Sequence, residues 1–308
     1  MESVGRVPLS LSGGARPELA TAEGGRPSLD QSTQLGAPGW RFTDWPECAE
    51  ASLAWVSPSA PFSRRRLLDE LREERAAEDW RGASELLAVV LAEQEELRWA
   101  RANGRAATKS RRYFVRNGLR YMWVLTFALA EQNRRVVMEE VSEFARRLRV
   151  ALGGAALAYW YSPELHPGGH GWHVNFFVAQ WIPAGLVGDM WGQGFVWVTD
   201  FARSPTGPKG EPLGLCRTPR EGWRRAARYG CKYAQKDWSA EHVGHANHRY
   251  EVAQGFAPLR HSLWVSGTAE AERLVSELVP AEAMAELTVW DSSSSSNWDR
   301  PPVRTWRW

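Results

Sequence analysis

Residues 121–127, Tyr-Met-Trp-Val-Leu-Thr-Phe, decide the fold class of this chain. Tyr121, Trp123 and the later odd-numbered positions alternate with a second set of side chains, which is the two-residue period of a strand. Before this stretch, residues 64–101 carry apolar side chains spaced by three and four, the pattern of a long helix that Gly82 divides in two. After it, residues 136–152 repeat the helical pattern. A strand between two helices therefore opens the folded part of the chain.

The remaining patterns extend this order of elements. They predict two strands joined by a Pro-Gly-Gly turn, then a strand, a helix, and a stretch of strand and loop: residues 155–161, 173–181, 195–201, 223–238 and 249–265. No internal repeat is present. Strands that follow each other through short turns, with helices between some of them, are typical of an α+β domain with a mainly antiparallel sheet.

Composition divides the chain into four regions. Gly, Pro and Ser are frequent near the N-terminus without apolar periodicity, so we expect residues 1–60 to be disordered. Residues 61–105 form a helical extension, and residues 106–268 form the main domain. Residues 269–308, which include five consecutive serines, are expected to be a mostly flexible tail.

Cysteine content and hydropathy limit the class of protein. The chain has three cysteines and no Cys-x-x-Cys pair, which argues against a disulfide scaffold and a zinc finger. No apolar run approaches the roughly 20 residues of a membrane span, and the N-terminus lacks the layout of a signal peptide. We expect a cytoplasmic protein that does not associate with a membrane.

Charge is segregated along the chain, although the net charge is only +2. Residues 101–264 carry an excess of basic side chains, whereas the flanking regions are acidic. The stretch Arg101–Arg120 contains seven basic residues and no acidic one. This distribution suits a domain that binds a polyanion, and it equally suits a solvated helix in an Arg-rich protein.

Histidines cluster in residues 164–175, Glu-Leu-His-Pro-Gly-Gly-His-Gly-Trp-His-Val-Asn. In a strand, His173 and Asn175 point to the same face, and the hairpin lets His166 or Glu164 reach that face from the preceding strand. Imidazole combined with amide or carboxylate oxygens suits Mg²⁺ or Mn²⁺. The alternative is that these histidines are polar residues at the rim of a hairpin.

A second cluster, Tyr229-Gly-Cys-Lys-Tyr-Ala-Gln-Lys236, places two tyrosines and two lysines on one helix face. Tyrosine is a poor nucleophile at neutral pH, but nearby cations assist it. Only four of the 38 basic residues are lysines, and two of them follow these tyrosines at the same spacing. This bias favours a functional site over the alternative, an amphipathic helix that buries two tyrosines.

In chain order, this sequence resembles the three motifs of HUH endonucleases. The matching segments are the strand ending in Leu125-Thr126-Phe127, the His-x-Asn strand and the Tyr-x-x-Lys-Tyr-x-x-Lys helix. The chain looks most like the two-tyrosine replication initiators of rolling-circle plasmids and phages. The run 248–256, His-Arg-Tyr-Glu-Val-Ala-Gln-Gly-Phe, is similar to a stretch of actinobacterial plasmid initiators. The resemblance covers residues 110–265, about half of the chain.

The resemblance implies a five-stranded antiparallel sheet, backed by helices, that presents a metal site and a tyrosine helix to single-stranded DNA. Tyr229 or Tyr233 would attack a phosphodiester, form a 5′-phosphotyrosine and release a 3′-hydroxyl; the second tyrosine would later rejoin the ends. Lys232 and Lys236 would offset charge, and His166, His173 and Asn175 would hold Mg²⁺ or Mn²⁺. Residues expected to contact DNA are Arg111, Arg112, Arg116, Arg120, Trp172, Arg224, Arg225 and Arg228, with Trp223 and Trp238 as further stacking candidates.

The sequence departs from the family at Asn175, where the second histidine is expected. An amide oxygen binds a hard cation more weakly than imidazole does, so His166, His170 or Glu164 is needed to complete the site. His166 is preferred because it precedes His173 by seven residues, a span that suits a short hairpin. A degenerate, inactive domain is the alternative. His242, His245 and His248 are interpreted as loop residues rather than as a second metal site.

Other functions would use the same residues. A two-tyrosine HUH transposase shares the motifs, and a non-catalytic single-stranded-DNA binding protein would account for the charge and the tryptophans. No G-x-x-x-x-G-K-[ST] segment is present, so we expect the initiator to depend on a host helicase as well as a host polymerase.

Overall fold

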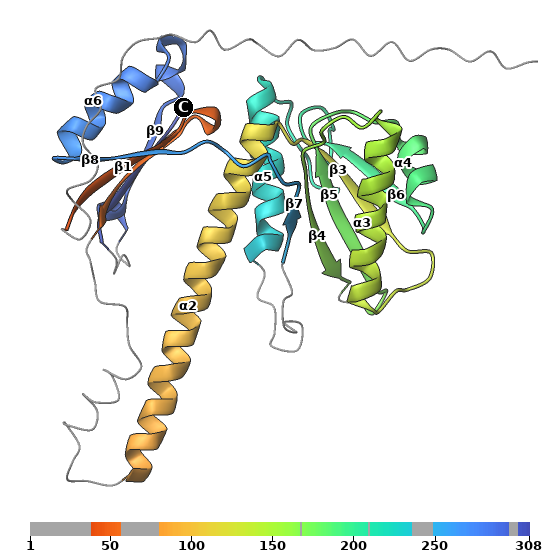
Figure 1. Cartoon of the computed structure of the whole chain (residues 1–308), viewed down its shortest axis with the longest axis horizontal. Helices are drawn as coiled ribbons and strands as arrows, with labels where there is room; N and C mark the ends of the chain where they lie inside the picture. The colour runs from red at the N-terminus through yellow and green to blue at the C-terminus, as the bar shows by residue number, and fades with distance from the viewer. Residues whose placement is uncertain (1–37, 57–79, 167, 209, 236–248, 296–300) are drawn as a thin grey trace, which may run out of the picture. The chain divides into compact units, whose positions relative to one another are not determined.

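Two five-stranded antiparallel sheets organise the residues that this computed structural model describes, which are 38–308 apart from 57–79, 167, 209, 236–248 and 296–300 (Figure 1). The middle sheet has the strand order β6-β3-β5-β4-β7, and the terminal sheet has the order β8-β1-β2-β10-β9. Helices flank the sheets, so the predicted α+β class with a five-stranded antiparallel sheet is confirmed.

The middle sheet contains the strand that opened the sequence analysis. Its strands are β3 (Tyr121–Thr126), β4 (Tyr159–Leu165), β5 (Trp172–Val178), β6 (Val196–Asp200) and β7 (Glu251–Val252). Alternate side chains of β3, β4 and β5 enter two separate cores, one on each face. On β5, for example, Phe176 belongs to one core and Phe177 to the other.

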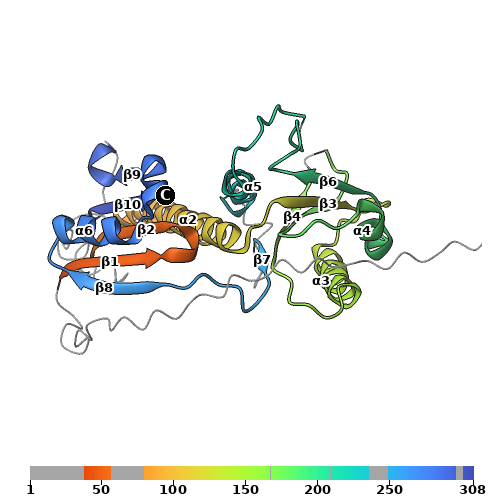
Figure 2. The same ribbon diagram turned by 90° about the horizontal axis from the view of Figure 1, so that it is seen from above.

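Helices cover both faces of this sheet. One face packs against α3 (Arg134–Ala151) and α4 (Ala184–Trp191), and the other against α5 (Pro219–Gln235) and the end of α2 (Trp80–Asn117). In Figure 2, α3 and α5 lie on opposite sides of the sheet. Helix α3 buries a stripe at helical spacing, from Val137 to Leu148. Helix α4, only eight residues long, is too short for its period to be recognised in the sequence.

The terminal sheet joins the two ends of the described chain. Its strands are β1 (Gly39–Trp45), β2 (Glu50–Val56), β8 (His261–Val265), β9 (Thr288–Asp291) and β10 (Val303–Arg307). Helix α6 (Thr268–Leu278) packs on it (Figure 1), and short 3-10 turns connect its elements: η1 (Pro46–Cys48), η3 (Ala281–Glu286) and η4 (Ser292–Ser294). Phe42, Leu53, Val275 and Trp306 form its core.

The terminal sheet corrects the predicted division of the chain. Disorder over residues 1–60 is wrong for 39–56, and a flexible tail over 269–308 is wrong for α6, β9 and β10. The predicted boundary at residue 268 also fails, because β8 pairs with β1. These strands find their partners up to about 250 residues away, so local composition carries no sign of the pairing.

Helix α2 corrects the predicted helical extension over 61–105. Gly82 does not interrupt α2, and the helix runs on to Asn117 inside the main domain. Phe114 of α2 lies against α5, and the Cys231 thiol donates to the Ala107 carbonyl at 3.2 Å. No helix among the described residues is both long and apolar enough to cross a membrane.

Candidate functional site

Four polar side chains line one face of the β4–β5 pair. Glu164 lies opposite His173 in the antiparallel register, and Ser162 lies opposite Asn175. Their chain neighbours, such as Val174, point into the core on the α3 side. The predicted pairing of His173 and Asn175 on one face is therefore what the structure shows, and the face is the one that α5 covers.

The Glu164 carboxylate connects this group. Its Oε2 lies 3.2 Å from His173 Nε2 and accepts a hydrogen bond of 3.4 Å from Asn175 Nδ2. The Asn175 side chain is buried, with 1% exposure, whereas 14% of the Glu164 side chain and 20% of the His173 side chain remain exposed. Glu164 therefore joins His173 and Asn175 in one partly buried polar cluster.

Glu164, rather than the preferred His166, completes the group. Strand β4 begins at Tyr159 and continues to Leu165, later than the predicted 155–161, so Glu164 comes directly opposite His173. His166 lies beyond the strand, exposed, and its Nδ1 accepts from the Gly168 N–H. Its ring lies 4.9 Å from that of His170 and 6.4 Å from that of His173.

A glycine fixes this hairpin. Gly171 has φ of 77°, and a Cβ there would approach the backbone of Glu131 to 2.6 Å. Only glycine tolerates both conditions. The next residue, Trp172, donates its backbone N–H to Glu131 O at 2.8 Å and its indole N–H to Gln132 O at 3.1 Å. These contacts set the start of β5 and with it the position of His173.

The two tyrosines lie together on α5, as the spacing predicts. Tyr233 donates its hydroxyl proton to the Tyr229 hydroxyl at 2.8 Å, and each residue is 7% exposed. Gly230 explains their orientation, because a Cβ there would come within 2.7 Å of the Phe114 ring. Since the glycine lets α5 lie against α2, the adjacent Tyr229 turns toward the sheet and contacts Phe201 at 5.3 Å between ring centroids.

The hydroxyls of Tyr229 and Tyr233 differ in the influences that act on their pKa values. Burial raises the pKa of both tyrosines, and the carboxylates of Glu211 and Glu164 raise them further. The shared hydrogen bond acts in opposite directions: it lowers the pKa of Tyr229, the acceptor, and raises that of Tyr233, the donor. The Lys232 ammonium lies 5.5 Å from the Tyr229 ring centroid. Lys236 lies outside the described residues.

The donors of this polar cluster fit a hard divalent cation in their chemistry. They comprise a carboxylate, an imidazole and an amide, the mixed oxygen and nitrogen set that suits Mg²⁺ or Mn²⁺. Among the described residues, no group of three or more His, Cys, Asp or Glu side chains could hold a metal ion. A metal held here would therefore depend on the Asn175 oxygen as a third donor, and that amide would have to rotate, since its nitrogen now faces Glu164.

The predicted DNA-binding arginines of α2, and Arg120 just after this helix, have acidic partners. Arg111 and Arg112 pair with Glu50, Arg116 pairs with Glu47 at 2.8 Å, and Arg120 lies 3.5 Å from Asp200. These four side chains are ion-paired within the folded chain and do not form a run of unpaired basic charge. Their partners come from other parts of the chain, so the sequence of α2 alone does not reveal them.

Of the predicted DNA-binding residues on α5 and β5, some have partners within the chain, one is buried and one is exposed. Arg224 donates to the Trp308 carbonyl at 2.6 Å, and Arg225 donates to Gly214 O at 2.6 Å, whereas Arg228 is exposed. Trp172 is buried in the core on the α3 side at 6% exposure. The prediction that Trp172 stacks on DNA is therefore wrong, because alternation points it away from α5. Trp238 and the loop histidines, His242, His245 and His248, lie outside the described residues.

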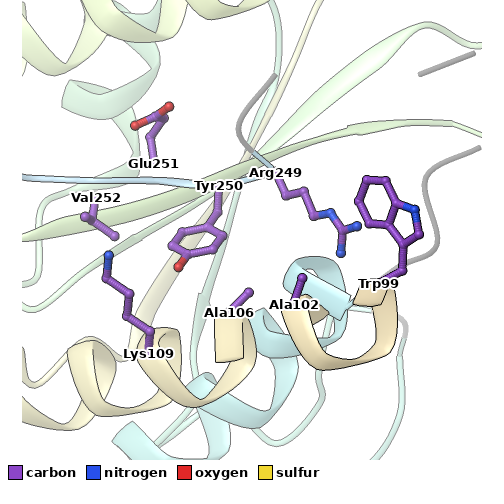
Figure 3. Close-up of a pocket in the computed structure, with 8 residues that line it drawn as sticks. All are labelled: Trp99, Ala102, Ala106, Lys109, Arg249, Tyr250, Glu251 and Val252. Carbon is purple, nitrogen blue, oxygen red and sulfur yellow. The ribbon is translucent and has the colours of Figure 1, made fainter. Parts of the chain in front are cut away.

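A hollow of about 430 Å³ lies beside α2 and was not predicted (Figure 3). The Arg249 guanidinium lies 5.2 Å from the ring centroid of Trp99, which is 41% exposed, and donates to Ala234 O at the end of α5. Tyr250 stacks on Trp160, with ring centroids 5.5 Å apart. The only signal in the sequence was an aromatic residue on the polar face of a basic helix, which periodicity alone does not distinguish from a core position.

Compared with models of protein families, with curated proteins and with solved structures, the chain gives no match.

Proposed function

We propose that this chain is a DNA-nicking and -joining endonuclease with a tyrosine nucleophile that initiates rolling-circle replication. One observation carries the proposal: two hydrogen-bonded tyrosine hydroxyls lie on α5, the helix that packs on the sheet face bearing Glu164, His173 and Asn175. A nucleophile on the same side of the sheet as donors for a hard cation suits attack on a phosphodiester.

The reaction is a reversible transfer of one phosphoryl group. The tyrosine oxygen attacks the phosphorus, the bond from phosphorus to the 3′-oxygen breaks, and the tyrosine proton passes to that oxygen. The products are a 5′-phosphotyrosine and a free 3′-hydroxyl from which a host polymerase extends. Joining runs the same exchange in reverse, with a 3′-hydroxyl attacking the phosphotyrosine.

Tyr229 is the first nucleophile in this proposal. It accepts the hydrogen bond from Tyr233, so its phenolate is stabilised, and Lys232 adds positive charge 5.5 Å from its ring. Tyr233 loses its proton less readily, because its hydroxyl is the donor. It is therefore the residue held for the second cleavage, and Lys236 remains its expected cationic partner.

Glu164, His173 and Asn175 are the residues that would hold Mg²⁺ or Mn²⁺. Such a cation would polarise the scissile phosphate and offset the charge of Glu164, which otherwise opposes ionisation of both tyrosines. His173 and Asn175 already hold Glu164 in place through its Oε2. The substrate is origin DNA that is single-stranded at the nick, and a host helicase would unwind it in the cytoplasm.

The decisive experiment incubates the full chain with supercoiled DNA of its own replicon, in Mn²⁺ or Mg²⁺ and in EDTA. We expect metal-dependent nicking and a covalent DNA–protein adduct that mass spectrometry maps to Tyr229. Tyr229→Phe should shift the residual adduct to Tyr233, and the double Phe variant should form none. Tyr161→Phe, a change at a buried tyrosine on the opposite face, is the matched control.

A non-catalytic single-stranded-DNA binding protein is the second candidate. It is favoured by the shielding of both tyrosines, each 7% exposed, and by the dependence of a metal on an amide oxygen. This candidate predicts that the double Phe variant and EDTA leave DNA binding unchanged and that no adduct forms under any condition. A two-tyrosine transposase would form the adduct on the ends of a mobile element instead of a plasmid origin.

A further inference from the structure

Five arginines from distant parts of the chain surround a hollow of about 140 Å³. Two come from α2, two from α5 and one from β10, and one carboxylate lies among them: Arg111, Arg112, Arg224, Arg228, Arg307 and Glu50. We name this the arginine pocket. Its members are separated by up to about 250 residues in the sequence, so no local pattern indicates it.

One carboxylate serves three of these arginines. Glu50, which is 4% exposed, lies 2.7 Å from Arg111, 2.6 Å from Arg112 and 3.4 Å from Arg307. A buried carboxylate can neutralise one guanidinium, so the group as a whole keeps its positive charge.

The other two arginines form no ion pair with a described side chain. Arg224 donates to a backbone oxygen of Trp308, the last residue of the sequence, where a terminal carboxylate would offset part of its charge; Glu286, which does not line the pocket, offsets a further part. Arg228 has no hydrogen bond with any described residue either. The remaining titratable side chain that lines the pocket, Cys48, stays a neutral thiol because burial raises its pKa to about 12. Within the pocket, five guanidinium groups therefore face a single carboxylate.

The guanidinium groups of the arginine pocket repel one another. Burial, together with the neighbouring guanidinium groups, lowers the pKa of Arg224 and of Arg307. Like charges held this close in a partly buried hollow repel one another, and an anion among them removes the repulsion. Arginine forms paired hydrogen bonds to phosphate oxygens, so several arginines around one small hollow suit a phosphate group in particular.

We propose that the arginine pocket binds a phosphate group and that in the working protein this group belongs to the DNA backbone. Only the naming of DNA rests on the proposed function; the phosphate chemistry stands on the pocket itself. The volume of about 140 Å³ is several times the ~30 Å³ of one water in the liquid, enough for a phosphate. Arg228 directly precedes Tyr229 in α5, so a strand held at the pocket is anchored on the helix that carries the tyrosines.

The test compares the full chain with Arg228→Gln and with Arg224→Gln/Arg228→Gln. Arg228 is exposed, so the single variant stays informative if the double variant is unstable. Arg146→Gln is the matched control, because it removes the same charge from an exposed position of α3. Binding of a fluorescent single-stranded oligonucleotide is measured at several salt concentrations, with EDTA present to prevent cleavage.

We expect the double variant to bind DNA at least about tenfold more weakly. The slope of its affinity against salt concentration, both on logarithmic scales, should become shallower by about 0.7 for each DNA phosphate that it no longer neutralises. Arg146→Gln should resemble the wild type. Equal affinity and equal salt dependence for all four proteins would overturn the assignment of DNA as the ligand.

A second measurement distinguishes the DNA backbone from a free phosphorylated ligand as the source of the phosphate group. Inorganic pyrophosphate should raise the melting temperature of the wild type and of Arg146→Gln but not that of the double variant. Pyrophosphate protection without any effect of the variants on DNA binding would support a phosphate site that takes a free phosphorylated ligand. Absence of both effects would overturn the proposal. Nicking plays no part in either readout, so failure here is distinguishable from failure of the nuclease proposal.

Discussion

The two faces of the middle sheet are built from the same strands and differ in what they bury. Toward α3 and α4 the face is apolar, with Trp123 stacked on Phe176 at 5.7 Å and Phe144 against both. Toward α5 the face starts with similar aromatic packing around Phe177, but at one end of β4 and β5 it becomes polar.

Residues that are adjacent in β5 thus have different roles. Val174 belongs to the apolar core, whereas His173 and Asn175 on either side of it belong to the polar cluster with Glu164. Burying an amide is costly unless it is hydrogen-bonded, so the polar end of the face is maintained by its contact with Glu164. One face supplies stability, and that stability lets the other face hold polar groups together.

The largest difference, in the rate of adduct formation, is expected between variants of the tyrosines on the two faces. Tyr229→Phe should lower the rate of adduct formation at least about a thousandfold, because it removes the proposed nucleophile. Tyr161→Phe should leave the rate within about threefold. Rates are measured by single-turnover nicking in Mn²⁺, and equal reductions in both variants would break the functional distinction between the faces.

The apolar face should dominate stability. Phe144→Ala removes a fully buried ring and is expected to lower the free energy of unfolding by about 3–5 kcal/mol. Val150→Ala on the same helix, at an exposed position, should change it by less than about 0.5 kcal/mol. Urea titration followed by circular dichroism measures both, and a small decrease for Phe144→Ala would mean that this core is loosely packed.

Adjacent residues of β5 allow a sharper test. Asn175→Leu should reduce metal-dependent nicking by at least the roughly 10–100-fold typical of damaged metal sites, with a stability change of about 1 kcal/mol. Val174→Thr buries a hydroxyl on the apolar face and should cost about 1–3 kcal/mol without changing the rate per folded molecule. If Asn175→Leu lowered stability but left the nicking rate per folded molecule unchanged, Asn175 would have a structural role only.

Stability should decline at alkaline pH, because tyrosines on both faces have raised pKa values in the folded chain. Their stabilising contribution is complete below the ordinary tyrosine pKa of about 10 and is lost as the pH rises above it. The slope should approach about 1.4 kcal/mol per pH unit for each tyrosine that ionises only on unfolding. Urea midpoints between pH 8 and 11 measure it, and the double Phe variant should show a shallower decline.

The smallest effect concerns the cysteines. Burial raises the pKa of Cys48 to about 12 and that of Cys231 to about 11, and it also raises the pKa of Cys216, the least enclosed of the three. Since the thiolate is the reactive form, maleimide should label Cys216 first and Cys48 last. Mass spectrometry of partly labelled protein gives the order, and early labelling of Cys48 would show that the contact of η1 with α2 opens readily.

Several features were predictable because they depend on local periodicity. The strand at Tyr121, the shared face of His173 and Asn175, and the shared face of Tyr229 and Tyr233 all follow from the geometry of a strand or a helix. The choice between Glu164 and His166 did not follow. It depends on where β4 begins and on the contact of Gly171 with Glu131, which a turn motif does not specify.

The arginines show that ion pairing, too, could not be predicted from the local sequence. Sequence identified Arg111 and Arg112 as basic residues without a nearby acid, yet the structure pairs both with Glu50 about 60 residues away. It also brings Arg307 to the same carboxylate. Electrostatic pairing acts through space, so a local excess of charge in the sequence does not measure the charge at a surface.

The sequence by itself determined the class of the fold, the elements of the middle sheet and the two clusters of reactive side chains, because each depends on neighbours within a few residues. The tertiary structure decided that the ends of the chain form a second sheet, that Glu164 joins His173 and Asn175, and that five arginines surround one hollow, three of them paired with Glu50. These features depend on strand register and on contacts across as many as about 250 residues. Backbone pairing and core packing select those contacts only when the whole chain folds.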